Sequence, residues 1–241
     1  MDTLLIRARY RITYVVHCEP HCVILRAVDI ESRDKRELLL CTYDGPLLRE
    51  YLPGFKALRH CPEFEGLFIE DDSLVTVFSF REDPAIDEVF YRGVAVPWRE
   101  RILFAQQLFH RALELTDAPP FLSCAAFLSE NLRVSRKNRA LYTRYAVKPV
   151  ADASARELTL LVSDQVGKVL PRRWDSPAAE HALLDTLARG EFTSPVALYG
   201  YWASVKPALE AEYAKAEAMS AMPRFLHYFF LNLRRLFRKK R

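Results

Sequence analysis

Two stretches of the chain contain several side chains that could bind a metal ion or take part in catalysis. The first, His17-Cys18-Glu19-Pro20-His21-Cys22, holds two histidines and two cysteines within six residues. Soft nitrogen and sulfur ligands at Cys18, His21 and Cys22 suit zinc. Structural zinc sites draw their ligand pairs from two separated segments, and no second Cys-x-x-Cys or His-x-x-x-His pair occurs elsewhere in the chain. We interpret this stretch as an exposed hairpin turn, with zinc as the alternative, and assign no metal or cofactor site.

The second stretch runs from Cys124 to Ala146 and places the carboxylate of Glu130 beside the amide of Asn131. Its pattern predicts two short strands over 127–134 and 139–145, joined by a polar turn. Before it, apolar residues recur every three or four positions between Pro97 and Leu115, which predicts a helix with one face in the core.

A helix, a loop and a hairpin in this order resemble the catalytic segment of protein kinases. In that family a His-Arg-Asp-x-Lys-x-x-Asn loop leads into a hairpin that ends at Asp-Phe-Gly. The resemblance places Asn131 at the metal-binding asparagine and Ala126, in a loop Cys124-Ala125-Ala126, at the catalytic aspartate. Arg144-Tyr145-Ala146 replaces Asp-Phe-Gly. One asparagine can neither accept a hydroxyl proton nor hold two metal ions, so we expect no catalysis.

The first 80 residues resemble the small lobe of a kinase. The hairpin predicted over Arg9 to Asp29 has the length of the kinase glycine-rich hairpin, but its three glycine positions become His17, Glu19 and Cys22. Backbone approaches a triphosphate closely only where side chains are absent, and Glu19 would also repel the phosphates. We therefore do not expect nucleotide binding.

The strand that supplies the phosphate-binding lysine in kinases corresponds to 37–42, which contains no lysine. A helix predicted over 47–60, interrupted at Pro53-Gly54, ends in a segment that resembles the Leu-x-His-Pro of the kinase regulatory helix. Without a lysine partner, Glu50 is expected to be a surface carboxylate. A hairpin over 64–80 completes five predicted strands, enough for a small antiparallel lobe.

The second half of the chain is expected to be mainly helical. Residues 81–96 correspond to the hinge and a short helix. Beyond Ala146 we predict a strand over Leu158 to Val162, a helix from Ser176-Pro177 to near Gly190, and a longer helix from Tyr199 to Ala221. No activation segment with an Ala-Pro-Glu anchor is recognisable, so the resemblance implies a trimmed C-lobe.

Composition narrows the class of protein. Half of the 241 residues are hydrophobic and only seven are glycine, which is typical of a packed globular chain. No signal peptide or bilayer-spanning run is recognisable, and five cysteines do not form a disulfide framework, so we expect a reducing, cytoplasmic setting. The last 20 residues hold seven Lys/Arg and no Asp/Glu, which leaves an acidic body that is not expected to bind nucleic acid.

The basic C-terminal segment combines this charge with aromatic and aliphatic residues, which is typical of a helix lying on anionic lipid. The alternative is that its apolar residues pack on the body while the charges are solvated. The residues predicted to contact a membrane or a partner are Phe225, Phe229, Phe230, Leu233, Arg234, Arg235, Phe237, Arg238, Lys239, Lys240 and Arg241.

Together these patterns predict an α+β, two-lobed, protein-kinase-like fold. Residues 1–221 form a pseudokinase-like domain, with an antiparallel N-lobe over about 1–82 and a helical C-lobe over about 83–221, and residues 222–241 form a basic amphipathic tail. We expect no enzyme activity but a scaffold or regulatory module that binds a protein partner at the cytoplasmic face of the cell membrane. Its arrangement resembles the membrane-linked pseudokinase domains of bacterial type VII secretion.

Two alternatives remain open. A phosphotransferase with displaced catalytic groups would need other carboxylates, for which Glu130 and Asp164 are the candidates. Alternatively, the order of elements is accidental, and the chain is an unrelated α+β adaptor that binds a protein through its acidic body.

Overall fold

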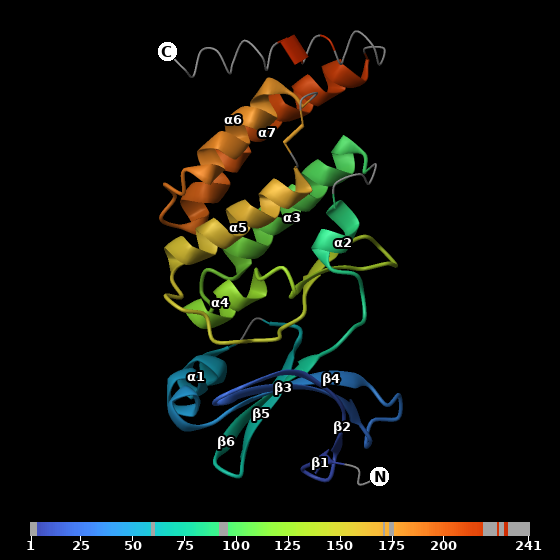
Figure 1. Cartoon of the computed structure of the whole chain (residues 1–241), viewed down its shortest axis with the longest axis vertical. Helices are drawn as coiled ribbons and strands as arrows, with labels where there is room; N and C mark the ends of the chain where they lie inside the picture. Colours follow the sequence, from blue (N-terminus) through green and yellow to red (C-terminus); the bar gives the residue numbers. More distant parts are fainter. Residues whose placement is uncertain are drawn as a thin grey trace. The chain divides into compact units, whose positions relative to one another are not determined.

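The structure, a computed structural model, describes residues 4–58, 61–91, 96–170, 172–173, 176–218, 226 and 229–230 (Figure 1). The chain divides into two compact units, and each unit is built from two separate segments. The first unit comprises Met1–Ile86 and Asp117–Ser154, and the second comprises Asp87–Thr116 and Ala155–Arg241.

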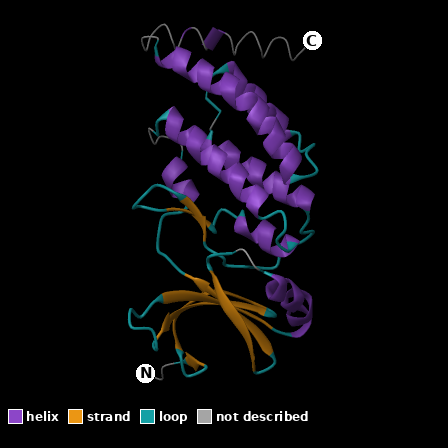
Figure 2. Cartoon of the chain, turned by 180° about the vertical axis from the view of Figure 1, so that it is seen from behind, coloured by secondary structure: helices purple, strands orange, loops and turns teal. Residues whose placement is uncertain are grey.

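The first unit contains a six-stranded antiparallel sheet in the order β1-β2-β3-β4-β6-β5 and a separate two-stranded hairpin, β7-β8 (Figure 2). Its elements in chain order are β1 (Leu5–Ile6), β2 (Tyr10–Glu19), β3 (Cys22–Asp29), β4 (Glu37–Tyr43), α1 (Gly45–Ala57), β5 (Phe64–Glu70), β6 (Ser73–Ser79), α4 (Pro120–Ala126), β7 (Leu132–Val134) and β8 (Leu141–Thr143). The five predicted strands of the small lobe are confirmed, and β1 adds a sixth.

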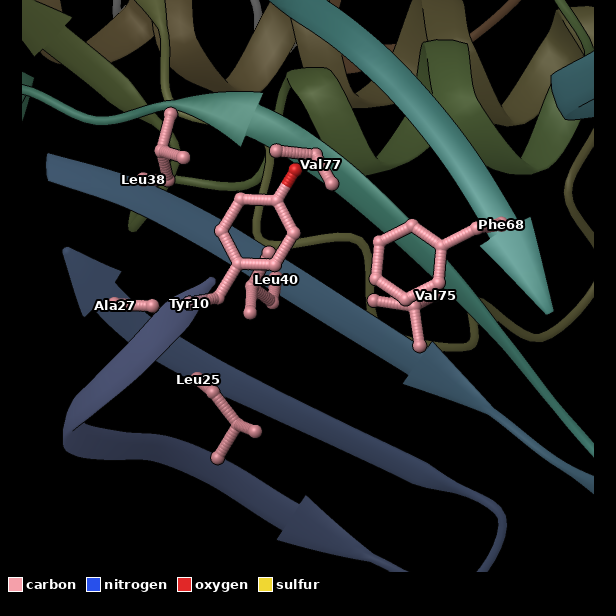
Figure 3. Packing of buried hydrophobic residues seen from close by; sticks show 8 residues of the cluster. All are labelled: Tyr10, Leu25, Ala27, Leu38, Leu40, Phe68, Val75 and Val77. Carbon is pink, nitrogen blue, oxygen red and sulfur yellow. The ribbon is translucent and has the colours of Figure 1, made fainter. Parts of the chain in front are cut away.

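The sheet curls tightly around one of its two faces. Tyr10 of β2 and Phe68 of β5 belong to strands that have three other strands between them in the sheet, yet their rings stack with centroids 5.9 Å apart. Neighbouring strands are about 4.8 Å apart, so a flat sheet would hold these rings much further from each other. The curl encloses an apolar cluster drawn from β2 to β6, shown in Figure 3: Tyr10, Leu25, Ala27, Leu38, Leu40, Phe68, Val75 and Val77.

The opposite face of the sheet packs against α1 through aromatic rings. Tyr43 of β4 lies 5.0 Å from Tyr51 and 5.8 Å from Phe55 of α1, measured between ring centroids. Tyr51 also stacks on Phe121 of α4 at 4.1 Å. Because side chains alternate between the faces of a strand, β4 is buried on both, and its run of apolar residues follows from this.

The second unit is helical: α2 (Ile86–Phe90), α3 (Trp98–Glu114), α5 (Ala155–Val169), α6 (Ala178–Ala188) and α7 (Pro195–Glu217). In its interior Trp202 of α7 is fully buried, stacks on Phe109 of α3 with centroids 4.8 Å apart, and donates its indole N–H to Gln106. The helices predicted over 97–115, 176–190 and 199–221 are confirmed as α3, α6 and α7, with shifted ends.

The strand predicted over Leu158 to Val162 is wrong, because these residues belong to α5. A five-residue apolar run fits a strand or a buried helix equally well, and only the longer pattern separates them. The buried residues Leu158, Val162, Val166 and Val169 follow the helical spacing of four, four and three.

The predicted interruption of the helix at Pro53-Gly54 is also wrong, because α1 runs through Pro53 and ends at Ala57. Proline removes one backbone hydrogen bond from a helix. Tyr51 and Phe55, on either side of it, are almost fully buried, and we infer that their packing offsets this loss. Arg59 and His60, which belong to the predicted Leu-x-His-Pro end, lie outside the described residues.

Replacing Gly54 by alanine is expected to destabilise the protein, although alanine favours helices. A Cβ atom at Gly54 would lie 2.8 Å from the ring of Phe121 and 3.0 Å from Pro119, and Phe121 cannot yield easily because it is stacked on Tyr51. We expect Gly54→Ala to lower the free energy of unfolding by about 1–3 kcal/mol in a denaturant titration.

Gly200 of α7 provides the matched control, since a Cβ atom there would meet nothing within 4 Å. Gly200→Ala is therefore expected to add up to about 1 kcal/mol of stability. Equal effects of the two substitutions would contradict the close approach of α1 to Phe121.

Candidate functional site

The segment from α4 to Val147 forms the candidate site, and it belongs to the same compact unit as the sheet. The predicted hairpin is present but shorter than expected, because only Leu132–Val134 and Leu141–Thr143 pair. Between them, the Ser135 N–H donates to the carbonyl of Ala140 at 2.9 Å and closes the turn. Cys124-Ala125-Ala126, predicted as a loop, is instead the last part of α4, where all three residues are fully buried.

The amide of Asn131 is fully engaged within the protein. Its Nδ2 donates to the carbonyl of Ala125 at 2.7 Å and to that of Ala146 at 3.1 Å, and its Oδ1 accepts from the Ala146 N–H at 3.2 Å. The residue has no exposed surface. In this arrangement Asn131 joins the end of α4 to the strand-like segment after β8, and its side-chain oxygen does not face solvent.

The segment Tyr145–Val147 packs directly against β4. The Tyr43 hydroxyl donates to the carbonyl of Val147 at 2.6 Å, and the Cys41 thiol donates to that of Tyr145 at 3.4 Å. The Tyr145 ring stacks on Phe78 of β6 with centroids 5.1 Å apart. Burial raises the pKa of the Cys41 thiol to about 11 and the pKa of Tyr43 well above its usual value, so both remain protonated donors at neutral pH.

This packing determines what a ligand could reach on β4. The side chains on the face that meets Tyr145–Val147 are Leu39, Cys41 and Tyr43, and none has exposed surface. The resemblance to kinases places the phosphate-binding lysine on this strand, and β4 contains no lysine. Lys35, which precedes it, and Glu50 of α1 are both exposed.

An arginine, Arg144, lies where the kinase resemblance calls for a magnesium-binding aspartate. Arg144 is partly buried, and a terminal guanidinium nitrogen donates to the carbonyl of Glu130 at 3.1 Å. Burial lowers its pKa, and the nearby cation of Arg133 lowers it further. A cation here opposes the binding of a second cation such as Mg²⁺.

The two carboxylates considered for displaced catalysis each pair with a lysine. Glu130 lies 2.7 Å from the Lys148 ammonium group in the first unit, and Asp164 lies 3.0 Å from that of Lys168 in the second. Asp164 and Lys168 also line a cavity of about 760 Å³ together with Asp87, Phe90 and Leu184.

The two histidines and two cysteines of the first stretch lie at the β2–β3 turn, as predicted for a hairpin. Cys18 is exposed, whereas Cys22, the first residue of β3, is fully buried. His21 contacts the carboxylate of Asp44 instead of a cysteine. Within the described residues, no group of three His, Cys, Asp or Glu side chains could hold a metal ion.

Of the residues predicted to contact a membrane or a partner, only Phe229 and Phe230 are described, and their rings meet edge to face at 5.7 Å. The Phe230 side chain is exposed. The others, which lie outside the described residues, are Phe225, Leu233, Arg234, Arg235, Phe237, Arg238, Lys239, Lys240 and Arg241. No helix in the described ranges is long and apolar enough to span a bilayer.

Comparison with solved structures shows which class of fold this is. The kinase domain of PknI from Mycobacterium tuberculosis, solved as a double mutant, matches with a TM-score of 0.54 and 13% sequence identity. The match covers 88% of this chain and 99% of that chain. No family model and no curated protein matches the sequence. The chain therefore has a protein-kinase-like fold, with a curled antiparallel N-lobe and a helical C-lobe, which confirms the predicted fold class.

Replacing Asn131 by alanine should be strongly destabilising, because it leaves the Ala125 carbonyl and both backbone groups of Ala146 without this partner. Buried unsatisfied polar groups cost about 1–3 kcal/mol each, so we expect the free energy of unfolding to fall by about 3 kcal/mol or more. Asn131→Asp should be at least as harmful, since a carboxylate cannot donate to either carbonyl.

Asn138→Ala is the control, because that side chain is exposed and only accepts from the Ala140 N–H in the hairpin turn. It should cost about 1 kcal/mol or less in the same denaturant titration. An Asn131→Asp variant as stable as the parent would overturn the structural role and favour a metal-ligand role.

Proposed function

We propose that this protein is a non-catalytic, kinase-fold module that binds another protein. The observation that carries this proposal is the burial of Leu39, Cys41 and Tyr43 beneath Tyr145–Val147, on the strand where a kinase holds the nucleotide phosphates. A nucleotide could reach these side chains only if Tyr145–Val147 moved away from β4. The kinase-like fold is retained, but the protein itself fills the nucleotide side of β4. The outer surface of such a fold remains available for binding a partner protein.

The charges of the candidate site support the same proposal. Phosphoryl transfer requires a base for the attacking hydroxyl and metal ions held by carboxylate and amide oxygens. Here Ala126 is at the position of the base, Arg144 is at the position of a metal ligand, and the Asn131 amide bonds to backbone. The base is thus replaced by an apolar methyl group, the carboxylate ligand by a cation, and the amide ligand by a side chain that is bonded to the backbone.

We also propose that the C-terminal segment holds the module at the cytoplasmic face of a membrane. Seven Lys/Arg residues with no Asp/Glu over 222–241, interleaved with aromatic residues, favour anionic lipid. The resemblance to membrane-linked pseudokinase domains of bacterial type VII secretion supports this setting by analogy.

The competing function is a phosphotransferase whose catalytic carboxylates have moved. Glu130 and Asp164 are exposed enough to be reached by solvent, and each is paired with a lysine. The unrelated-adaptor alternative assumed a fold without kinase-like architecture, whereas the chain has a protein-kinase-like fold.

A thermal-shift titration with ATP tests the proposal. A ligand that binds only the folded state and is present at about 100 times its dissociation constant adds roughly 2.7 kcal/mol, which moves the melting temperature by several degrees. We expect no magnesium-dependent shift, so ATP with magnesium should move the melting temperature no further than ATP and magnesium do separately.

Variants separate the two functions. A magnesium-dependent shift that disappears in Glu130→Gln or Asp164→Asn, together with ATP turnover that is lost in the same variant, would establish the phosphotransferase. The two substitutions serve as controls for each other, since each removes one carboxylate from a lysine pair.

Vesicle binding tests the membrane proposal. Co-sedimentation is expected with vesicles that contain phosphatidylserine and not with neutral phosphatidylcholine vesicles. Replacing Arg238, Lys239, Lys240 and Arg241 by glutamine should weaken it strongly, since each basic residue near such a surface contributes about 1 kcal/mol. Binding that is unchanged by these substitutions would point to packing of the tail instead.

A further inference from the structure

Two arginines lie on the same face of the β7–β8 hairpin and its extension. Arg133 pairs with Tyr142 across the strands, and Arg144 follows Tyr142 by two positions, so the three side chains share one face. The alternate residues Leu132 and Thr143 are buried on the other face. The alternation thus brings two guanidinium groups together at the partly exposed face of the hairpin.

Both guanidinium groups donate hydrogen bonds to the same uncharged acceptor, the backbone carbonyl of Glu130. Terminal nitrogens of Arg133 and Arg144 donate to the carbonyl oxygen of Glu130 at 2.7 and 3.1 Å, and both bonds lie at the exposed end of the side chains. Arg133 also donates to the carbonyl of Asp83 at 3.3 Å. The Nε–H group of each arginine is buried without a hydrogen-bond partner among the described residues.

The neighbouring carboxylates are occupied by other groups. The Glu130 carboxylate pairs with Lys148, and the Glu82 carboxylate pairs with Arg26 at 3.2 Å. The Asp83 carboxylate accepts from the Tyr142 hydroxyl at 3.0 Å and from the Arg136 N–H at 3.2 Å. In the part of the chain that the structure describes, neither Arg133 nor Arg144 forms an ion pair with a carboxylate.

Two partly buried cations that form no ion pair with a described carboxylate are an unusual arrangement in a folded protein. Charges removed from water are ordinarily paired, because leaving one uncompensated is strongly unfavourable. Burial lowers the pKa of Arg144, and the nearby cations of Arg133 and Arg26 lower it further, while Glu130 and Tyr142 act in the opposite direction. An anion bound at the two exposed guanidinium ends would remove this repulsion.

We propose that Arg133 and Arg144 form a binding site for a phosphate group. Planar guanidinium forks bind phosphate oxygens through pairs of charge-assisted hydrogen bonds, and a phosphate monoester carries nearly two negative charges against two arginines. A carboxylate would neutralise only one of them. The site does not depend on the scaffold function, because a phosphate can bind there whether or not the protein turns over ATP.

The test is a nuclear magnetic resonance titration of the full chain with inorganic phosphate, at constant ionic strength set with sodium chloride. The Nε–H resonances of Arg133 and Arg144 report on the site directly. We expect saturable shifts of both, and binding at least about tenfold weaker in Arg133→Gln and in Arg144→Gln, since each loses charge-assisted hydrogen bonds.

Arg36→Gln is the matched control, because it removes one positive charge from an exposed ion pair with Glu65 on the sheet. It should leave phosphate binding unchanged. Arg144→Lys keeps the charge but loses the planar fork, and it should bind more weakly than the parent. Without phosphate, Arg144→Gln should melt no lower than the parent, because the repulsion between the arginines is relieved.

The source of the phosphate is identified by two further titrations. One uses a glycine-serine peptide with a single phosphoserine, with the unphosphorylated peptide as its control, and the other uses ATP without magnesium. Tighter binding of the phosphopeptide assigns the site to a protein partner, and tighter binding of ATP assigns it to a nucleotide. Shifts that do not saturate, or that persist in a variant lacking both arginines, would overturn the proposal.

Discussion

The interaction on which the candidate site depends is the hydrogen bonding of one buried amide. Asn131 holds the end of α4 and the segment after β8 together by satisfying three backbone groups that no water can reach. With Ala146 held in this way, Tyr145 and Val147 lie where β4 can donate to their carbonyls. The packing of Tyr145 and Val147 against β4 therefore depends on the Asn131 hydrogen bonds, in which each donor has an acceptor.

The sheet itself is shaped by burial on both faces. The stacking of Tyr10 on Phe68 closes the curl over one apolar cluster, while the rings of Tyr43, Phe55 and Phe78 cover the other face. The middle of β4, from Leu38 to Cys41, has no solvated side on which to carry a charge. The absence of a lysine from β4 is consistent with this, since a buried ammonium group would need a paired carboxylate.

The same principle explains where charge does occur. Arg133 and Arg144 reach the partly exposed face of the β7–β8 hairpin, where their hydrogen bonds to described residues go to carbonyl oxygens. Arg144 places a cation at the position where the kinase resemblance would have a magnesium-binding aspartate. A cation at this position opposes the binding of magnesium and attracts an anion.

The sequence by itself determined the order of elements, because strands, turns and long helices follow from local periodicity and from glycine and proline positions. The class of fold was predicted from the resemblance of that order to protein kinases. The resemblance to the kinase catalytic segment also singled out Asn131 and Arg144. The prediction from the sequence was wrong at α1 and α5, where packing of Tyr51, Phe55 and the stripe from Leu158 to Val169 overrides a local signal. Only the tertiary structure showed that the Asn131 amide bonds to backbone, that β4 has no accessible side chain beneath the sheet, and that two arginines converge on one carbonyl. These features arise between segments distant in the sequence, whose distances and burial no local pattern encodes.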